Sequence, residues 1–183
     1  MSYEVAINKA WENLGQFKPE KALTVKFLAD AYIVDYPNRQ VTSSAGNIPA
    51  KEHLEILILH YLFQKFKGLP VLSGEWISFK ELEAGEIYYP AFRKRAIDPI
   101  LKKYGNNPQG LFCVLERLAA ENVKQGDVAI VVQVFEGVPF MVVLWQGDSE
   151  FGPEANLLFD SSIAGIFNSE DVAVLAGFLA RQI

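Results

Sequence analysis

Two continuous apolar runs near the C-terminus form the clearest pattern in the sequence. The runs Val128–Phe135 and Val138–Trp145 are rich in Val and Phe, and Glu136-Gly137 separates them. Short β-branched and aromatic runs joined by a two-residue turn that ends in Gly predict a β-hairpin. Neither run alternates between polar and apolar residues, so we expect both strands to be covered on both faces. The shorter run Asn156–Phe159 predicts a further strand.

Apolar residues at helical spacing predict most of the remaining elements. The expected helices are Ser2–Leu14, Pro49–Lys67, Pro90–Ile97 with a restart at Asp98-Pro99, Pro108–Ala120 and Ser169–Arg181. The second of these is apolar on nearly every side, which is typical of a central, buried helix. Trp11 in the first helix is expected to be a core anchor, and Asn168 is expected to cap the last one.

Short β-type runs separated by turn-forming residues predict an antiparallel meander near the N-terminus, over Leu23–Leu28, Ala31–Tyr36 and Gln40–Ser44. The segment Gly74–Phe79 fits either a short edge strand or an irregular turn. Helices and antiparallel strands are segregated along the chain, so the fold class is α+β. We expect a single domain over residues 1–183, with a mostly antiparallel sheet (the N-terminal meander plus the C-terminal hairpin and short strand) packed with roughly five to six helices.

Composition narrows the range of partners and cofactors. The net charge of −5 argues against a general nucleic-acid binder, because such proteins gain much of their affinity by neutralising phosphates. Cys113 is the only cysteine, so this chain alone builds no disulfide framework, zinc knuckle or iron–sulfur cluster. The N-terminus has no basic start followed by an apolar core, and no uncharged apolar stretch reaches about 18 residues. We therefore expect a cytoplasmic protein with no membrane partner.

Standard catalytic motifs do not occur in the sequence: there is no phosphate-binding Gly-rich loop, Gly-x-Gly-x-x-Gly, His-Glu-x-x-His or Gly-x-Ser-x-Gly. The main candidates for chemistry are carboxylates on the loop after the hairpin, Asp148, Glu150 and Glu154, together with Asp160 if its strand returns beside that loop. Such oxygen ligands suit a divalent cation, and two close carboxylates can also serve as acid and base. The alternative is an ordinary acidic turn, with Asp160 capping the helix that follows it.

Other side chains have both a functional and a structural interpretation. Arg93 and Arg95 form either an anion clamp for a phosphate or carboxylate or a solvated basic face. His60 is either a buried neutral histidine with a hydrogen-bond partner or a catalytic group. Cys113 is expected to be an inert, buried thiol.

Several segments, in this order and spacing, resemble a known family. They are Leu59-His60-Tyr61-Leu62, Gly74-Glu75-Trp76-Ile77-Ser78-Phe79, Leu144-Trp145-Gln146-Gly147-Asp148-Ser149-Glu150-Phe151 and Leu158-Phe159-Asp160. Together they resemble the bacterial and archaeal family called domain of unknown function 3786, over nearly the whole chain. The resemblance implies no assigned reaction. Some members carry an additional cysteine-rich iron–sulfur segment, which this chain lacks.

Three hypotheses about function follow. The first is a binding or accessory module that holds a small anionic or metal-associated ligand, or a protein partner, with ligand-binding candidates Asp148, Glu150, Asp160, Trp145, Trp76, Arg93, Arg95 and His60. The second is a hydrolase or lyase that uses the Asp148 and Glu150 carboxylates with a divalent cation or with His60. The third is a homodimer formed through Val174 and Phe178 of the last helix.

Overall fold

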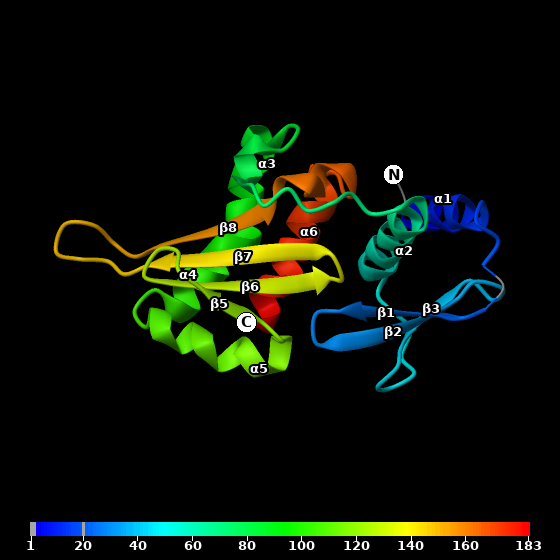
Figure 1. Cartoon of the computed structure of the whole chain (residues 1–183), viewed down its shortest axis with the longest axis horizontal. Helices are drawn as coiled ribbons and strands as arrows, with labels where there is room; N and C mark the ends of the chain where they lie inside the picture. Colours follow the sequence, from blue (N-terminus) through cyan, green and yellow to red (C-terminus); the bar gives the residue numbers. More distant parts are fainter. Residues whose placement is uncertain (1–2, 20) are drawn as a thin grey trace. The chain divides into compact units, whose positions relative to one another are not determined.

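The computed structural model describes residues 3–19 and 21–183 (Figure 1). The chain divides into two compact units, Met1–Pro70 and Val71–Ile183, and each is described by itself. The expectation of a single domain over residues 1–183 stays a prediction. The expected α+β class is confirmed, because helices accompany antiparallel sheets in both units.

The N-terminal unit contains the predicted meander between two helices. Its elements are α1 (Tyr3–Gly15), β1 (Leu23–Phe27), β2 (Asp30–Asp35), β3 (Gln40–Ser43) and α2 (Glu52–Lys67). Ser2, with which the first helix was expected to begin, lies outside the described residues. The second helix begins later than expected because Pro49 pairs with Thr42 in an isolated antiparallel bridge.

Trp11 is the core anchor that its spacing predicts. Its side chain is 1% exposed, and its indole Nε1 donates a hydrogen bond of 2.8 Å to Oε1 of Glu55 on α2. Burial raises the pKa of Glu55, the Trp11 hydrogen bond opposes that rise, and the nearby Glu52 charge adds to it. A buried indole that reaches a partner in this way fixes the two helices against each other.

The C-terminal unit is built on an antiparallel sheet with strand order β4-β8-β7-β6-β5. Its strands are β4 (Trp76–Ser78), β5 (Glu121–Val123), β6 (Val128–Phe135), β7 (Val138–Trp145) and β8 (Glu154–Asp160). The hairpin β6–β7 is confirmed at the predicted residues, and positive φ at Gly137 supplies its turn. The segment after Gly74 is the edge strand β4, whereas β5 was not predicted because its three residues are mostly polar.

The sheet is apolar on both faces. Helices that include α4 (Asp98–Tyr104) and α6 (Ser169–Gln182) lie behind one face in Figure 1, and the fully buried side chains of the sheet include Phe140 and Phe159. On the other face Met141 and its buried neighbours pack with partly buried apolar side chains that include Trp76 and Leu158. Every residue of β7 except the terminal Trp145 is buried, which confirms the expected two-sided cover for this strand.

The helical segments of this unit are α3 (Gly85–Phe92), the π-helical turn η2 (Arg93–Ile97), α4 (Asp98–Tyr104), the 3₁₀ segment Pro108–Val114, α5 (Leu115–Leu118) and α6 (Ser169–Gln182). The prediction of one α-helix over Pro108–Ala120 is wrong, since most of it is 3₁₀. The restart expected at Asp98-Pro99 is a continuation through η2. Pro99 has no N–H and its ring crowds the carbonyl four residues earlier, so the Asp98 N–H bonds the Arg93 carbonyl in a wider turn.

Candidate functional site

The carboxylate of Asp148 shapes its own loop. Its Oδ1 accepts hydrogen bonds of 2.8 Å from the backbone N–H groups of Glu150 and Phe151, and the Asp148 N–H donates to the Phe151 carbonyl. These bonds lower the pKa of Asp148 because they favour the charged form. Gly147 allows the turn, since a Cβ there would lie 2.8 Å from the Phe151 carbonyl oxygen. The acidic loop is thus organised by hydrogen bonds to its own backbone.

Asp160 does not return beside this loop, and that prediction is wrong. Trp145 and Glu154 are paired where the loop leaves the sheet, whereas Asp160 pairs with Trp76 at the opposite end of β8. Glu154 and Asp160 are six positions apart along the strand, which is about 20 Å. The proposed metal site of Asp148, Glu150 and Asp160 therefore does not form. In the part of the chain that the structure describes, no three His, Cys, Asp or Glu side chains are grouped so as to hold a metal ion.

The Asp160 side chain instead joins β8 to the start of the C-terminal unit. It is 3% exposed, and it accepts hydrogen bonds from the backbone N–H groups of Ser73, Gly74 and Ser162 and from the Ser73 hydroxyl. Burial alone would raise the pKa of Asp160, but the hydrogen bonds outweigh it and hold the pKa well below its usual range. The capping alternative is confirmed, because the bond to Ser162 caps the short turn that follows.

Three of the sequence candidates do come together. Arg93, Trp145 and Glu154 line a hollow of about 260 Å³ beside the base of the acidic loop. The Arg93 Nε donates a hydrogen bond of 3.2 Å to Oδ1 of Asp98, and both side chains are more than half exposed. Arg93 already has an acidic partner, so this hollow presents little free positive charge to a ligand.

The remaining candidates lie elsewhere. Trp76 belongs to the half-buried sheet face beside Asp160. His60 is half-buried on α2 of the N-terminal unit. Cys113 is exposed, so its predicted burial is wrong. In a 3₁₀ helix residues three apart share a face, and the face of Leu111 and Val114 takes the core position there.

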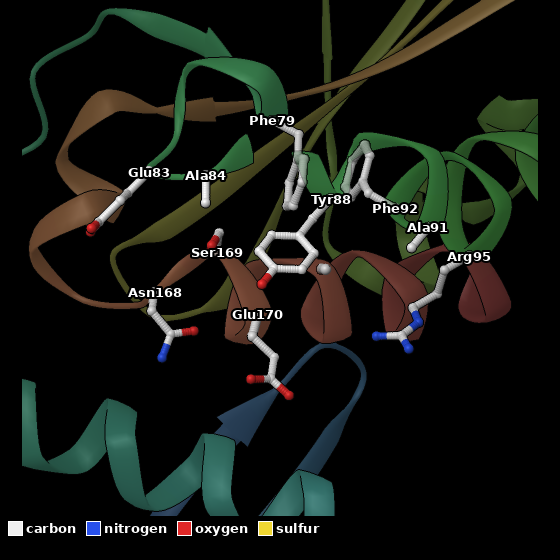
Figure 2. Close-up of a pocket in the computed structure, with 11 residues that line it drawn as sticks. Phe79, Glu83, Ala84, Tyr88, Ala91, Phe92, Arg95, Asn168, Ser169 and Glu170 are labelled. Carbon is white, nitrogen blue, oxygen red and sulfur yellow. The ribbon is translucent and has the colours of Figure 1, made fainter. Parts of the chain in front are cut away.

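Arg95, by contrast, opens onto the larger of these cavities, about 550 Å³ in volume (Figure 2). Its walls come from the β4–α3 connection, from α3 and η2, and from the start of α6: Phe79, Glu83, Ala84, Tyr88, Ala91, Phe92, Arg95, Asn168, Ser169, Glu170 and Ala173. A volume of this size is typical of small-molecule sites. We call this cavity the Arg95 pocket.

The floor of the Arg95 pocket is aromatic and rigid. Phe79 and Phe92 stack with ring centroids 4.1 Å apart and planes 8° from parallel, and each is 1% exposed. Phe92 in turn meets Phe159 of the sheet edge-on at 6.3 Å. Tyr88 is 57% exposed and its ring stands in the middle of the lining residues (Figure 2). The floor is therefore continuous with the core, while Tyr88 is available to a ligand.

The charged wall depends on close packing between η2 and α6. A Cβ at Gly177 of α6 would lie 2.7 Å from Cγ and 2.9 Å from Cδ of Arg95, so the glycine makes room for the arginine stem. No carboxylate among residues 3–19 and 21–183 forms an ion pair with Arg95. The stem thus packs against α6, and the guanidinium lines the pocket without an ion pair to a described carboxylate.

The beginning of α6 adds hydrogen-bond donors. Asn168 caps the helix as predicted, because its Oδ1 accepts a hydrogen bond of 2.9 Å from the Asp171 N–H. The N–H groups of Ser169 and Glu170 belong to the first turn, where a helix provides no internal acceptor. Both residues line the pocket, so its polar side combines Arg95 with the positive end of a helix dipole.

A strained turn closes the other end of the pocket. Ala84 has a left-handed backbone with φ of 55°, and a Cβ on the following Gly85 would lie 2.0 Å from the Phe79 carbonyl oxygen. The sequence predicts Arg95 as a candidate anion ligand but does not indicate Tyr88, Ser169 and Glu170. Nothing in the spacing of these residues shows that α3 packs against α6. The left-handed Ala84 also hides the start of α3 from the helical pattern.

Comparison with protein-family models matches residues 7–182 to a family described as Domain of unknown function (DUF3786). Searches of curated proteins and of solved structures found no match. No helix within the described ranges has the length and apolar character that crossing a membrane requires.

Proposed function

The chain belongs to the family of domain of unknown function 3786, whose description names no activity, and from the pocket geometry we propose that it is a binding module for a small organic anion. The ligand sits in the Arg95 pocket, with its carboxylate at the guanidinium and its apolar part against Tyr88 and the stacked phenylalanines. We also propose a cytoplasmic location, because a chain with a single cysteine forms no disulfide within itself, and disulfides are typical of extracellular proteins.

One observation carries the proposal: an arginine without an acidic partner faces a cavity with an aromatic floor. A guanidinium offers two parallel N–H donors that match a carboxylate, and such bonds are stronger than neutral ones. The stem of Arg95 packs against Gly177, which reduces the side-chain freedom that is left to lose on binding. The aromatic wall supplies the apolar contact that most small-molecule sites use.

The surroundings of the hydroxyl groups in the Arg95 pocket favour binding over catalysis. Ser169 and Tyr88 are the hydroxyl groups of the pocket, and among the described residues neither hydroxyl forms a hydrogen bond with Glu83 or Glu170, the lining carboxylates that could serve as a base. A serine or tyrosine needs such a base to act as a nucleophile or proton carrier. The hydrolase and homodimer hypotheses remain predictions from the sequence.

Calorimetric titration with 3-phenylpropionate tests the proposal, because this probe has one carboxylate and one aromatic group. Wild-type protein is expected to bind it, and Arg95→Gln is expected to weaken binding by about tenfold or more, as for the loss of a charged hydrogen-bond donor. Arg93→Gln is the matched control, since it removes an arginine of the same helical turn that lines a different hollow. Equal losses in the two variants, or no binding by the wild type, would contradict the proposal.

A further inference from the structure

We infer that the ligand of the Arg95 pocket is a zwitterion, namely an α-amino acid with an apolar side chain. Its carboxylate meets Arg95, its ammonium group meets Glu170, and its side chain lies against Tyr88 and the aromatic floor. The inference rests on the proposed function and adds a cationic group to the ligand.

The first step is the placement of two opposite charges on one cavity. Glu170 and Arg95 both line the pocket, yet they form no ion pair with each other or with another described residue. Figure 2 shows the Glu170 carboxylate and the Arg95 guanidinium as separate groups on the same side of the Tyr88 ring. A ligand with both charges can satisfy both groups at once.

The second step is the spacing along α6. Glu170, Ala173 and Gly177 fall three and four residues apart, so they share one face of the helix. Gly177 lies beneath the Arg95 stem, and the small Ala173 lines the pocket between the two charges. Glu170 and Gly177 are separated by about 10 Å along the helix axis. Because Ala173 and Gly177 are small, their side chains do not fill the space between the two charged side chains.

The third step is the overall charge of the lining. Glu83 and Glu170 are acidic and Arg95 is basic, so the pocket carries one more negative than positive charge. The Glu83 carboxylate points away from the other lining residues in Figure 2, which leaves Glu170 as the partner for a cationic group. A ligand with a carboxylate alone would bring a second negative charge near Glu170, and like charges disfavour such an arrangement. An ammonium group beside the carboxylate turns this repulsion into attraction.

The test is a titration with three matched probes: phenylalanine, 3-phenylpropionate, which lacks the ammonium group, and phenethylamine, which lacks the carboxylate. Leucine, methionine and tryptophan are titrated as well, and the matched analogues of the tightest amino acid are then used. The amino acid is expected to bind about tenfold or more tightly than either analogue. In Glu170→Gln the amino acid should bind no more tightly than 3-phenylpropionate. In Arg95→Gln it should bind no more tightly than phenethylamine.

Glu116→Gln is the control, because it removes an exposed glutamate of α5 that does not line the pocket. If 3-phenylpropionate binds as tightly as the amino acid and still depends on Arg95, the zwitterion inference is overturned and the proposed function stands. If phenethylamine binds as tightly as the amino acid, and its binding depends on Glu170 alone, the zwitterion inference and the proposed function are both overturned. If no probe binds, both are likewise overturned.

Discussion

Gly85 and Ala84 are adjacent residues with opposite backbone requirements at the edge of the Arg95 pocket. A Cβ at position 85 would lie 2.0 Å from the Phe79 carbonyl oxygen, which is backbone and cannot turn aside. Ala84 already has a Cβ, but its φ of 55° is a conformation that glycine adopts without steric cost. The two positions therefore make a matched pair for mutation.

We expect Gly85→Ala to lower the free energy of unfolding by about 3 kcal/mol, because the turn must open to admit the methyl group. We expect Ala84→Gly to leave the stability within about 1 kcal/mol of wild type, since relief of the left-handed strain offsets the added entropy of the unfolded chain. Urea unfolding of both variants measures this. A Gly85→Ala protein as stable as wild type would show that the turn is loose.

Asp160 makes stability depend on pH in a defined direction. Its folded pKa is depressed, so the unfolded state binds the proton more readily, and its contribution is present above the ordinary Asp pKa of about 3.9 and lost as pH falls below it. Asp160→Asn replaces one acceptor oxygen by an NH₂ group that cannot accept from the buried donors. We expect this to cost about 2 kcal/mol at pH 7.

Urea unfolding at pH 7 and at pH 3 measures that prediction. The difference between wild type and Asp160→Asn is expected to be large at pH 7 and smaller at pH 3, where the unfolded wild-type chain binds a proton at Asp160 that the folded state does not bind. Asp148→Asn is the control, because the pKa of Asp148 is also lowered by backbone hydrogen bonds but its side chain is on an exposed loop. A gap that stays constant with pH would mean that packing, and not charge, accounts for the role of Asp160.

At the scale of elements, the segments that suggested the family pair with one another. Gly74–Phe79 contains β4 and Leu158–Asp160 ends β8, and these two strands are neighbours with Ile77 opposite Phe159. Asp160 accepts hydrogen bonds from Gly74 at this junction, and Gly147 and Asp148 shape the loop at the other end of the strand pair. Fold requirements thus explain much of the motif, and Phe79 is the lining residue of the Arg95 pocket that belongs to it.

The sequence predicts elements whose pattern is local and misses what depends on distant contacts. The hairpin is marked by its own residues, with Gly137 between two β-type runs, and Asn168 marks the start of α6. Nothing near Asp160 shows that its strand runs away from the acidic loop, because strand order is decided by long-range packing. The π-helical turn follows from Pro99 only once α3 and α4 are known to form one continuous helix.

Substitution of Gly177 should affect the position of Arg95 more than the stability of α6. In a helix Ala is favoured over Gly by up to about 1 kcal/mol, but a Cβ here would lie 2.7 Å from the Arg95 Cγ. We expect Gly177→Ala to change the free energy of unfolding by less than about 1 kcal/mol, because the gain in helix propensity offsets displacement of a flexible side chain. Binding of 3-phenylpropionate should nevertheless weaken, because the guanidinium moves with its stem.

Thermal unfolding and calorimetric titration of Gly177→Ala are read together. Ala176→Gly on the same helix is the comparison, because residue 176 is 0% exposed and does not line the Arg95 pocket, so this change should lower stability through propensity and a lost buried methyl group without weakening binding. Loss of stability together with loss of binding would indicate that the helix itself has shifted. Full retention of binding would show that the Arg95 stem does not depend on the space at Gly177.

At the scale of the whole molecule, the two compact units are joined by a short exposed segment. Residues 68–72 contain no helix or strand, and Val71 is 90% exposed. The ordered contacts of the C-terminal unit begin at Ser73 and Gly74, whose N–H groups are bound by Asp160. Proteases need an extended, accessible backbone, so this segment combines accessibility with few restraints.

We expect limited digestion with elastase or chymotrypsin to cut first at Val71 or Leu72 and to release a stable fragment that begins near Ser73. That fragment contains every lining residue of the Arg95 pocket, so it should bind 3-phenylpropionate as the intact chain does. Asp160→Asn provides the matched control, because it frees Ser73 and Gly74 and should extend cleavage toward β4. The unit boundary is contradicted if the first cut falls within α2 or β8. A fragment that unfolds on release would instead favour a single cooperative domain over residues 1–183, as the sequence predicts.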